Sequence, residues 1–211
     1  MATGKTDIKG WIKEEFALLA KQHGFKVGLF SDIGAYAIYK KDSNGYVSIW
    51  FDIDSSRIGY AFDIRIDYVE KTIFELSRLP KYEKGSHTVC LPTKVNKFEY
   101  SPATTKEELM AYLAPLKEQF AEVVAQLEFY TNPQHVLDLW LSLKTNEDKN
   151  AYFGDAYKFA KMIVVAKLSN SSLLGVIAND SLMLYQKLAQ ENEAYMQKLE
   201  VCKRIIAHYE L

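Results

Sequence analysis

The sequence predicts an α+β fold in which an N-terminal helix and a four-stranded antiparallel meander are followed by a C-terminal helical bundle. Three observations predict it. Apolar residues recur at helical spacing over residues 7–23, the segments after them are rich in β-branched and aromatic residues, and helical spacing returns beyond residue 104. With 48% hydrophobic and 25% charged residues, the composition is that of an ordinary globular protein.

The first element is an amphipathic helix over residues 7–23. Ile8, Ile12, Phe16 and Leu19 lie three or four residues apart and form one apolar stripe. Gly24 follows, and glycine readily adopts the left-handed conformation that ends a helix. We therefore expect the helix to end there.

Four strands are expected next, at Val27–Ser31, Tyr36–Lys41, Tyr46–Asp54 and Tyr60–Tyr68. Asn44-Gly45 is a favoured two-residue hairpin loop, because both residues tolerate a positive φ. That loop places Tyr39 opposite Trp50, and a four-residue loop at residues 55–58 then places Trp50 opposite Asp63. The two hairpins agree on which side chains share a face.

Alternation along the strands separates an apolar face from a polar face. The apolar face must be covered, most simply by the N-terminal helix and a short helix around Val69–Leu79, so Phe51 and Ile64 should be core residues. Its members are Tyr36, Ile38, Val47, Ile49, Phe51, Ile53, Tyr60, Phe62, Ile64 and Ile66. The polar face collects Tyr39, Lys41, Trp50, Asp52, Asp54, Asp63, Arg65 and Asp67.

The remaining chain is divided by a proline-containing segment. Residues 1–80 form the helix-plus-sheet unit, residues 81–104 a linker, and residues 105–211 a helical region that can pack on the sheet as one domain; three of the five prolines, Pro80, Pro92 and Pro102, lie at or within the linker. Within the linker, Lys94–Tyr100 is a candidate for a further edge strand.

About four helices are expected in the bundle. Thr105-Lys106-Glu107-Glu108 is a capping box that starts a helix reaching Leu127, with a kink at Pro115. A second helix runs from Asn132-Pro133 through Leu143, a third covers roughly residues 150–168, and Asn179-Asp180 opens the last one.

The charge balance argues against nucleic-acid binding. The chain has 26 Lys and Arg residues against 27 Asp and Glu residues, a formal net charge of −1, and only four of the cations are arginine. A nucleic-acid-binding alternative needs a basic stripe of lysines such as Lys81, Lys84, Lys94 and Lys97. We therefore expect no nucleic-acid partner.

A soluble, cytoplasmic protein without a membrane partner is expected. The polar N-terminus lacks the apolar core of a secretory signal, and the most apolar stretch, Met162–Ala166, is far shorter than the roughly 20 residues that span a bilayer. Cys90 and Cys202 are far apart in the sequence, as expected of free thiols in a reducing compartment.

No catalytic signature is present. The sequence has no nucleophile elbow, no zincin motif and no glycine-rich dinucleotide fingerprint. His87 and Cys90 have the spacing of a zinc-ligand pair, but a structural zinc site needs a second pair. We therefore expect no cofactor, and we assign no catalytic residue and no metal ligand.

The candidate site lies on the polar sheet face, at Tyr39, Trp50, Asp52, Asp54 and Asp63. Tryptophan and tyrosine are typical anchors of protein interfaces, and carboxylates around them suit a basic partner. We expect an immunity-like or regulatory protein that binds a basic protein partner through this face. Packing of the C-terminal helices over the same aromatic residues is the competing interpretation.

A divalent-metal-dependent hydrolase is the alternative function. The predicted register sets Asp63 diagonally from Asp52, within reach of a cation shared with Asp54. Clustered carboxylates raise one another's pKa values and favour a counterion. Metal catalysis normally adds a Glu or Lys for acid–base chemistry, and none stands beside these aspartates. Protein binding is therefore the leading hypothesis.

The first third of the chain resembles small bacterial domains of unknown function that include suspected toxin-immunity proteins. The resemblance rests on a helix ending in His23-Gly24-Phe25, followed by Ala37-Ile38-Tyr39-Lys40 and Val47-Ser48-Ile49-Trp50-Phe51-Asp52. It implies a helix followed by an antiparallel sheet, and a role in binding rather than catalysis. No functional residue of the family is transferred, because no defining motif is matched.

Overall fold

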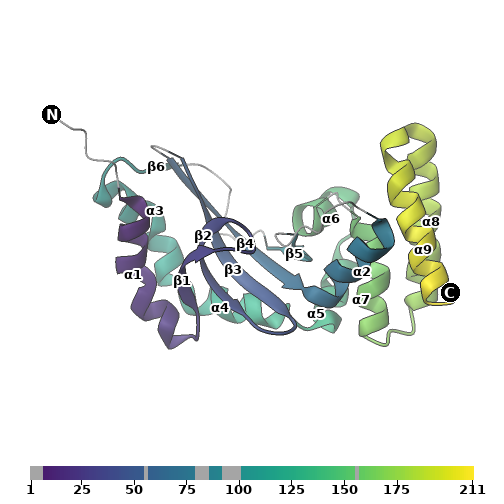
Figure 1. Cartoon of the computed structure of the whole chain (residues 1–211), viewed down its shortest axis with the longest axis horizontal. Helices are drawn as coiled ribbons and strands as arrows, with labels where there is room; N and C mark the ends of the chain where they lie inside the picture. The colour runs from purple at the N-terminus through teal and green to yellow at the C-terminus, as the bar shows by residue number, and fades with distance from the viewer. Residues whose placement is uncertain (1–6, 55–56, 79–85, 92–100, 155–156) are drawn as a thin grey trace.

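The computed structural model of the chain describes residues 7–54, 57–78, 86–91, 101–154 and 157–211, with the N-terminal helix at one end and the C-terminal helices at the other (Figure 1). The described strands are β1 (Lys26–Phe30), β2 (Ala35–Lys41), β3 (Gly45–Ile53), β4 (Arg57–Ile66), β5 (Val89–Cys90) and β6 (Ser101–Pro102). The described helices are α1 (Ile8–Gln22), α2 (Asp67–Ser77), α3 (Lys106–Glu118), α4 (Phe120–Phe129), α5 (Pro133–Ser142), α6 (Asn146–Phe153), α7 (Lys158–Leu168), α8 (Leu174–Glu191), the short 3₁₀ turn η1 (Glu193–Tyr195) and α9 (Met196–His208).

The α1 helix has the expected limits and the expected apolar stripe. The Asp7 side chain caps it by accepting a hydrogen bond of 2.9 Å from the Gly10 amide. Gly24 follows the helix with a φ of 75°, a conformation that favours glycine. Ile8, Ile12 and Phe16 are buried against the sheet side of the molecule.

The sheet is antiparallel, with the order β1-β2-β3-β4-β5. β6 also pairs with β4, so the two short strands occupy successive parts of the same β4 edge. The first four strands form the predicted meander. The candidate edge strand Lys94–Tyr100 lies outside the described residues.

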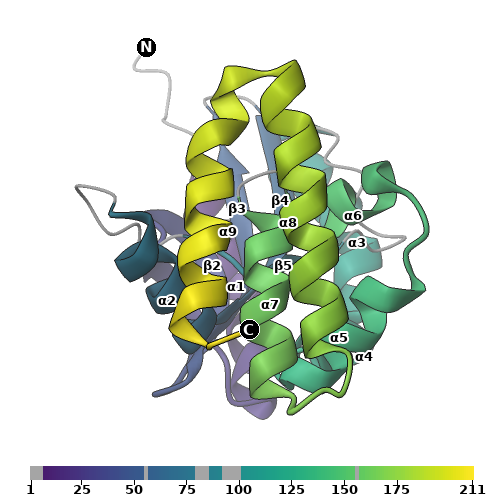
Figure 2. The same cartoon turned by 90° about the vertical axis from the view of Figure 1, so that its right-hand side faces the viewer.

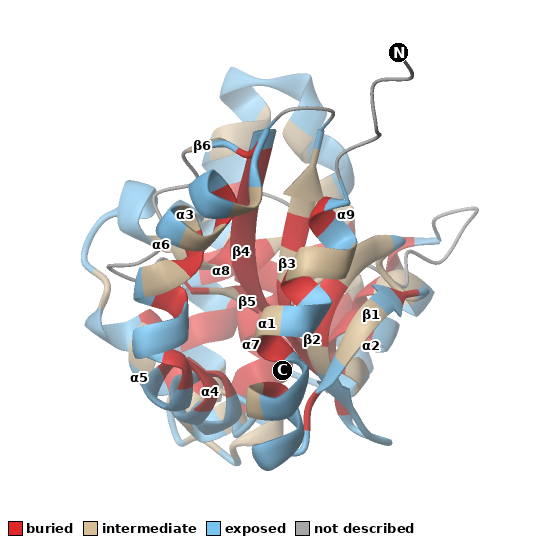
Figure 3. Ribbon diagram, turned by 90° about the vertical axis from the view of Figure 1, so that its left-hand side faces the viewer, coloured by how far each residue is buried: buried red, intermediate tan, exposed pale blue. Residues whose placement is uncertain are grey.

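The apolar sheet face faces the main core. Phe51 is 2% exposed and Ile64 is fully buried, as predicted. Figure 3 shows α1 lying across the buried strands, and α4 contacts β3 and β4. The expected helix around Val69–Leu79 exists as α2, which begins directly after β4 and packs mainly against α7 and α9.

The helical half contains more breaks than predicted. The helix that begins at Thr105 divides at Gln119 rather than at Pro115, and the helix expected over residues 150–168 is two helices, with Gly154 at the end of α6. The predicted start at Asn179-Asp180 is wrong, because α8 runs through both residues. The last helix, α9, begins at Met196 and follows η1, which Asn192 caps by accepting a hydrogen bond of 2.9 Å from the Ala194 amide.

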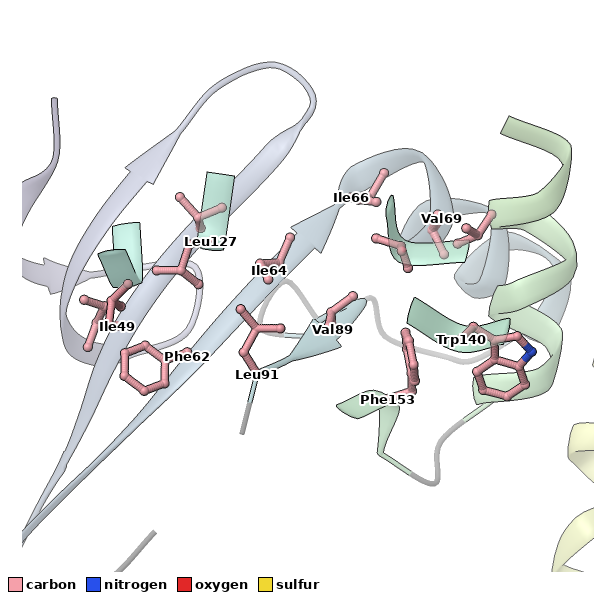
Figure 4. Close-up of a cluster of buried hydrophobic side chains, with 14 of the residues drawn as sticks. Ile49, Phe62, Ile64, Ile66, Val69, Val89, Leu91, Leu127, Trp140 and Phe153 are labelled. Carbon is pink, nitrogen blue, oxygen red and sulfur yellow. The ribbon is translucent and has the colours of Figure 1, made fainter. Parts of the chain in front are cut away.

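The C-terminal helices pack beyond the end of the strands. Figures 1 and 2 show α8 and α9 as a hairpin that lies side by side with α7 and projects past it. α9 also packs on α2. A single cluster of buried apolar side chains extends from α1 through the sheet to α9, and Figure 4 shows the part of it around β5.

Candidate functional site

The polar sheet face holds the residues that the sequence placed there. Tyr39 on β2 and Trp50 on β3 are half-buried, and so is Asp52. Asp54 follows β3 directly and is exposed. Asp63 on β4 differs from expectation because it is only 6% exposed.

The register of the first hairpin differs from the predicted one by two residues. Trp50 lies opposite Ala37, not opposite Tyr39. The reason lies in the turn, where the Asp42 amide donates to the Gly45 carbonyl (3.0 Å) and the Asp42 carboxylate accepts from the Gly45 amide (3.1 Å). Asp42 and Gly45 therefore close the turn, and a shift of two residues leaves every side chain on its predicted face.

The second hairpin is also shifted by two residues. The prediction placed Trp50 opposite Asp63, whereas Ser48 occupies that position. The loop is shorter than the predicted four residues, because Ile53 pairs with Ile58 and the Asp54 amide donates to the Arg57 carbonyl (3.0 Å). Residues 55–56 lie outside the described residues.

The shifted register separates the aspartates that the metal hypothesis needs together. Asp52 lies opposite Gly59, four residues along β4 from Asp63. At about 3.3 Å per residue, this places their backbones roughly 13 Å apart along the strand direction. A shared cation at Asp52 and Asp63 is therefore excluded by the strand pairing. Within the described ranges, His, Cys, Asp and Glu side chains form no group of three arranged to hold a metal ion.

A small apolar cluster on the polar face is distinct from the main core. We call it the second-face cluster; it consists of buried Phe30, Ala37 and Tyr46 with partly buried Ile33, Tyr39 and Trp50. Phe30 stacks on Tyr39 with ring centroids 4.2 Å apart, and it meets Tyr46 edge-on. All of its members come from β1, β2, β3 and the β1–β2 turn. The C-terminal helices contribute no member to this cluster as the described residues define it.

The two cations of the polar face, Lys41 and Arg65, are bound to carboxylates other than Asp52, Asp54 and Asp63. Lys41 forms an ion pair with Asp32 in the β1–β2 turn. Arg65 is buried, and its Nε lies 2.7 Å from the Asp67 carboxylate while its Nη1 donates to the Ser86 carbonyl at the same distance.

Asp63 is buried next to polar groups, on the sheet face that carries the second-face cluster. Its side chain is 8% exposed, and its Oδ2 lies 3.6 Å from Nδ1 of His87. Burial raises the pKa of Asp63 above its ordinary value, while His87 and hydrogen bonds from the Cys90 thiol and the Trp50 side chain oppose that rise. Asp63 therefore supports Trp50 from inside the fold.

The Cys90 thiol is not an activated nucleophile. Burial raises the pKa of Cys90 to about 12, and the charge of the Asp63 carboxylate adds to the effect. Cys202 is free as well, and burial raises its pKa to about 12. A nucleophilic cysteine needs a lowered pKa and an adjacent base, so the chemistry at Cys90 is structural.

A buried ion pair lies on the far side of β5. Lys161 of α7 reaches the Glu70 carboxylate of α2 over 2.9 Å, and both side chains are at most 6% exposed. The Thr88 hydroxyl donates to the same carboxylate (2.9 Å), and Lys161 also donates to the His87 carbonyl (2.7 Å). These bonds tie α2, α7 and the start of β5 into one polar network.

Sequence reasoning missed this network. Lys161 and Glu70 lie on different helices and are 91 positions apart in the sequence, so no local pattern links them. The sequence contains one signal of it. Apolar residues surround Lys161 on every side of α7, which is typical of a fully buried helix. A lysine buried in such a helix needs a partner inside the protein.

A cavity of about 300 Å³ opens beside the β2–β3 turn. Lys40, Tyr46, Arg65 and Glu128 contribute to its lining. Lys40 pairs with Glu128 across 2.6 Å, and Arg65 is bound to Asp67. Lys40, Glu128 and Arg65 therefore each have an ionic partner within the protein, and we assign the cavity no ligand. The lysines of the nucleic-acid alternative, Lys81, Lys84, Lys94 and Lys97, lie outside the described residues.

The described helices include none with the length and apolar character needed to cross a membrane. No family model matches the chain, and searches of curated proteins and of solved structures returned no significant match.

Proposed function

We propose that this chain is a protein-binding protein, immunity-like or regulatory in role, that contacts a basic partner through Tyr39, Trp50, Asp52 and Asp54. The observation that carries the proposal is the second-face cluster, an aromatic group set apart from the main core with Trp50 and Tyr39 only partly buried. Aromatic side chains at the centre and carboxylates beside them match the anchor-and-rim arrangement of protein interfaces.

Both aromatic side chains have packing partners within the fold before any partner binds. Tyr39 stacks on Phe30, and Trp50 packs against the second-face cluster with buried Asp63 nearby. Binding then costs less side-chain entropy, because the two largest anchors are already packed. Asp63 was expected in the contact surface; with 6% exposure it acts as a support for Trp50 instead.

The acidic part of the surface lies at the end of β3. Asp52 and Asp54 flank Ile53, and Asp54 is exposed next to Arg57 (3.3 Å). An exposed ion pair of this kind is weak, so an incoming Lys or Arg competes with Arg57 at little cost. This favours a basic partner whose charge mainly accelerates association.

The proposal is tested by capture with matched variants. Immobilised chain is exposed to a native cytoplasmic extract, and a retained protein is purified and titrated calorimetrically. Trp50→Ala should weaken binding by about 2 kcal/mol or more, roughly 30-fold, and Asp54→Lys should mainly slow association.

Two control variants make comparable substitutions outside the proposed contact surface. Leu18→Ala removes an apolar side chain that is 71% exposed on α1, and Glu191→Lys makes the same charge reversal on α8. Both should bind as the unmodified chain does. Normal binding by Trp50→Ala and Asp54→Lys, with melting temperatures unchanged, would show that the partner uses a different surface.

A further inference from the structure

The short strand β5 joins the sheet to the helical half. The Thr88 amide donates to the Ile64 carbonyl (2.8 Å) and the Leu91 amide to the Phe62 carbonyl (2.9 Å). Val89 is fully buried, and Figure 4 shows it with Leu91 between the sheet side chains and Phe153 of α6. Any opening of β5 therefore disturbs the contact between the two halves of the core.

Where β5 pairs with β4, a buried carboxylate lies next to a histidine side chain. His87, two residues before β5, has its Nδ1 3.6 Å from the Asp63 carboxylate, and 35% of its side chain is exposed to solvent. Asp63 has little contact with water. Histidine side chains change charge between about pH 5 and 8, so the compensation of the buried carboxylate changes within the physiological range.

The other charged and polar groups around this pair are already engaged. Trp50 and Cys90 are neutral donors to Asp63. Titratable groups on the elements packed around β4 and β5 include Tyr46 on β3, Arg65 on β4 bound to Asp67, and Glu70 on α2 paired with Lys161 on α7; α6 carries exposed Glu147, Asp148 bound to Thr145, and Lys149 over the Trp140 ring. Among the described residues, His87 is the histidine that faces Asp63.

We propose that β5 is a pH-sensitive latch, held on β4 more tightly when His87 is protonated than when it is neutral. With His87 charged, the buried Asp63 carboxylate has a cation 3.6 Å away. With His87 neutral, the cation that still acts on the carboxylate is Lys161, which is already paired with Glu70. Opening β5 admits water to the carboxylate, which stabilises the open state more when the His87 charge is lost. The equilibrium constant for opening therefore increases as the pH rises. The latch is independent of the proposed protein-binding role.

Native-state hydrogen exchange on the full chain tests the latch. The Thr88 and Leu91 amides report on β5, and the Val123 amide, bonded to the Gln119 carbonyl in α4, serves as a reference. After division by the intrinsic exchange rates, opening at Thr88 and Leu91 should increase about fivefold from pH 5.5 to 8.0, as expected for loss of one partly exposed ion pair. Opening at Val123 should change far less.

Variants separate His87 from other titrating groups. His87→Gln should remove the pH dependence at Thr88 and Leu91, while His208→Gln, an exposed histidine at the end of α9, should retain it. Asp63→Asn should also remove it and should hold β5 closed at pH 8.0. A pH dependence that persists in His87→Gln, or an absent one in the unmodified chain, would overturn the proposal.

Alkylation of Cys90 provides a second readout in a Cys202→Ser background. Cys90 lies in β5, and burial raises the pKa of its thiol to about 12, so its reaction is slow while the strand is closed and faster when the strand opens. Its rate, divided by the rate of the unfolded chain at the same pH, should show the same fivefold rise and the same loss of that rise in His87→Gln. A ratio that is flat in both chains would contradict the latch.

Discussion

A carboxylate on the polar face of a sheet is normally hydrated. The Asp63 carboxylate is instead buried next to His87, Cys90 and Trp50. The cost of burying its charge is the cause of its raised pKa. Trp50 packs in the second-face cluster near the same carboxylate. At the scale of a residue, the buried charge of Asp63 is therefore a cost to stability on the face that carries the aromatic surface.

Replacement of Asp63 by asparagine should stabilise the chain increasingly as the pH rises. The folded-state pKa of Asp63 lies above the ordinary value of 3.8, so the folded chain binds more protons than the unfolded chain between these two values. Protonation of Asp63 therefore stabilises the folded chain. This stabilisation is fully present below pH 3.8 and is lost as the pH rises through the folded-state pKa. Asp63→Asn removes this loss.

Urea denaturation at pH 4 and pH 7.5 measures the effect. The difference in unfolding free energy between Asp63→Asn and the unmodified chain should shift in favour of the variant at pH 7.5. Asp180→Asn, at an exposed position of α8, should show little pH dependence. Equal differences at the two pH values for Asp63→Asn would contradict the assigned environment.

At the scale of elements, α2 and α7 are joined by one buried ion pair. Glu70 and Lys161 are isolated from water, and Thr88 and the His87 carbonyl complete their hydrogen bonds. A buried ion pair contributes little net stability, but loss of one partner leaves an uncompensated charge. Its main effect is to fix how α2, α7 and β5 fit together.

Lys161→Met should destabilise the chain by about 3–5 kcal/mol, because it leaves the Glu70 charge buried without a cation. Adding Glu70→Gln to that variant should recover part of the loss, since glutamine is neutral and still accepts the Thr88 hydrogen bond. Chemical denaturation of the single and double variants forms the cycle. Additive losses would show that the two residues are not coupled.

At the scale of the whole molecule, one apolar cluster connects the N-terminal helix, the sheet and the C-terminal helices. β5 lies within it, between the strands and α6 (Figure 4). A helical half that unfolded alone would expose α7, which is buried along most of its length. The loss of so much apolar burial disfavours a half-folded state.

Thermal unfolding should therefore be a single cooperative transition. In a Trp140→Phe chain, tryptophan fluorescence comes from Trp11 on α1 and Trp50 on β3, whereas far-UV circular dichroism is dominated by the helices of the C-terminal half. The two signals should give the same midpoint, and the calorimetric and van't Hoff enthalpies should agree. Separate midpoints would show that the halves unfold independently.

The sequence alone determined the features that depend on neighbours along the chain. Period-two alternation assigned the faces of the strand residues correctly, but the strand predicted to reach Tyr68 ends at Ile66, and Asp67 begins α2 instead of lying on the polar face. Apolar spacing and the glycine that follows placed the end of α1. The strand register is less local. The observed turn, closed by Asp42 and Gly45, and the predicted turn, with Asn44-Gly45 as its two-residue loop, put every side chain on the same face, so alternation cannot distinguish the two registers.

Only the tertiary structure decided which polar residues lie together. It separated Asp52 from Asp63, buried Asp63 beside His87, and paired Glu70 with Lys161 across two helices. It also extended α8 through Asn179-Asp180, where helix packing overrides a local capping preference. Each outcome depends on contacts between segments far apart in the sequence, and the free energy of burying charge is set by those contacts rather than by the neighbouring residues.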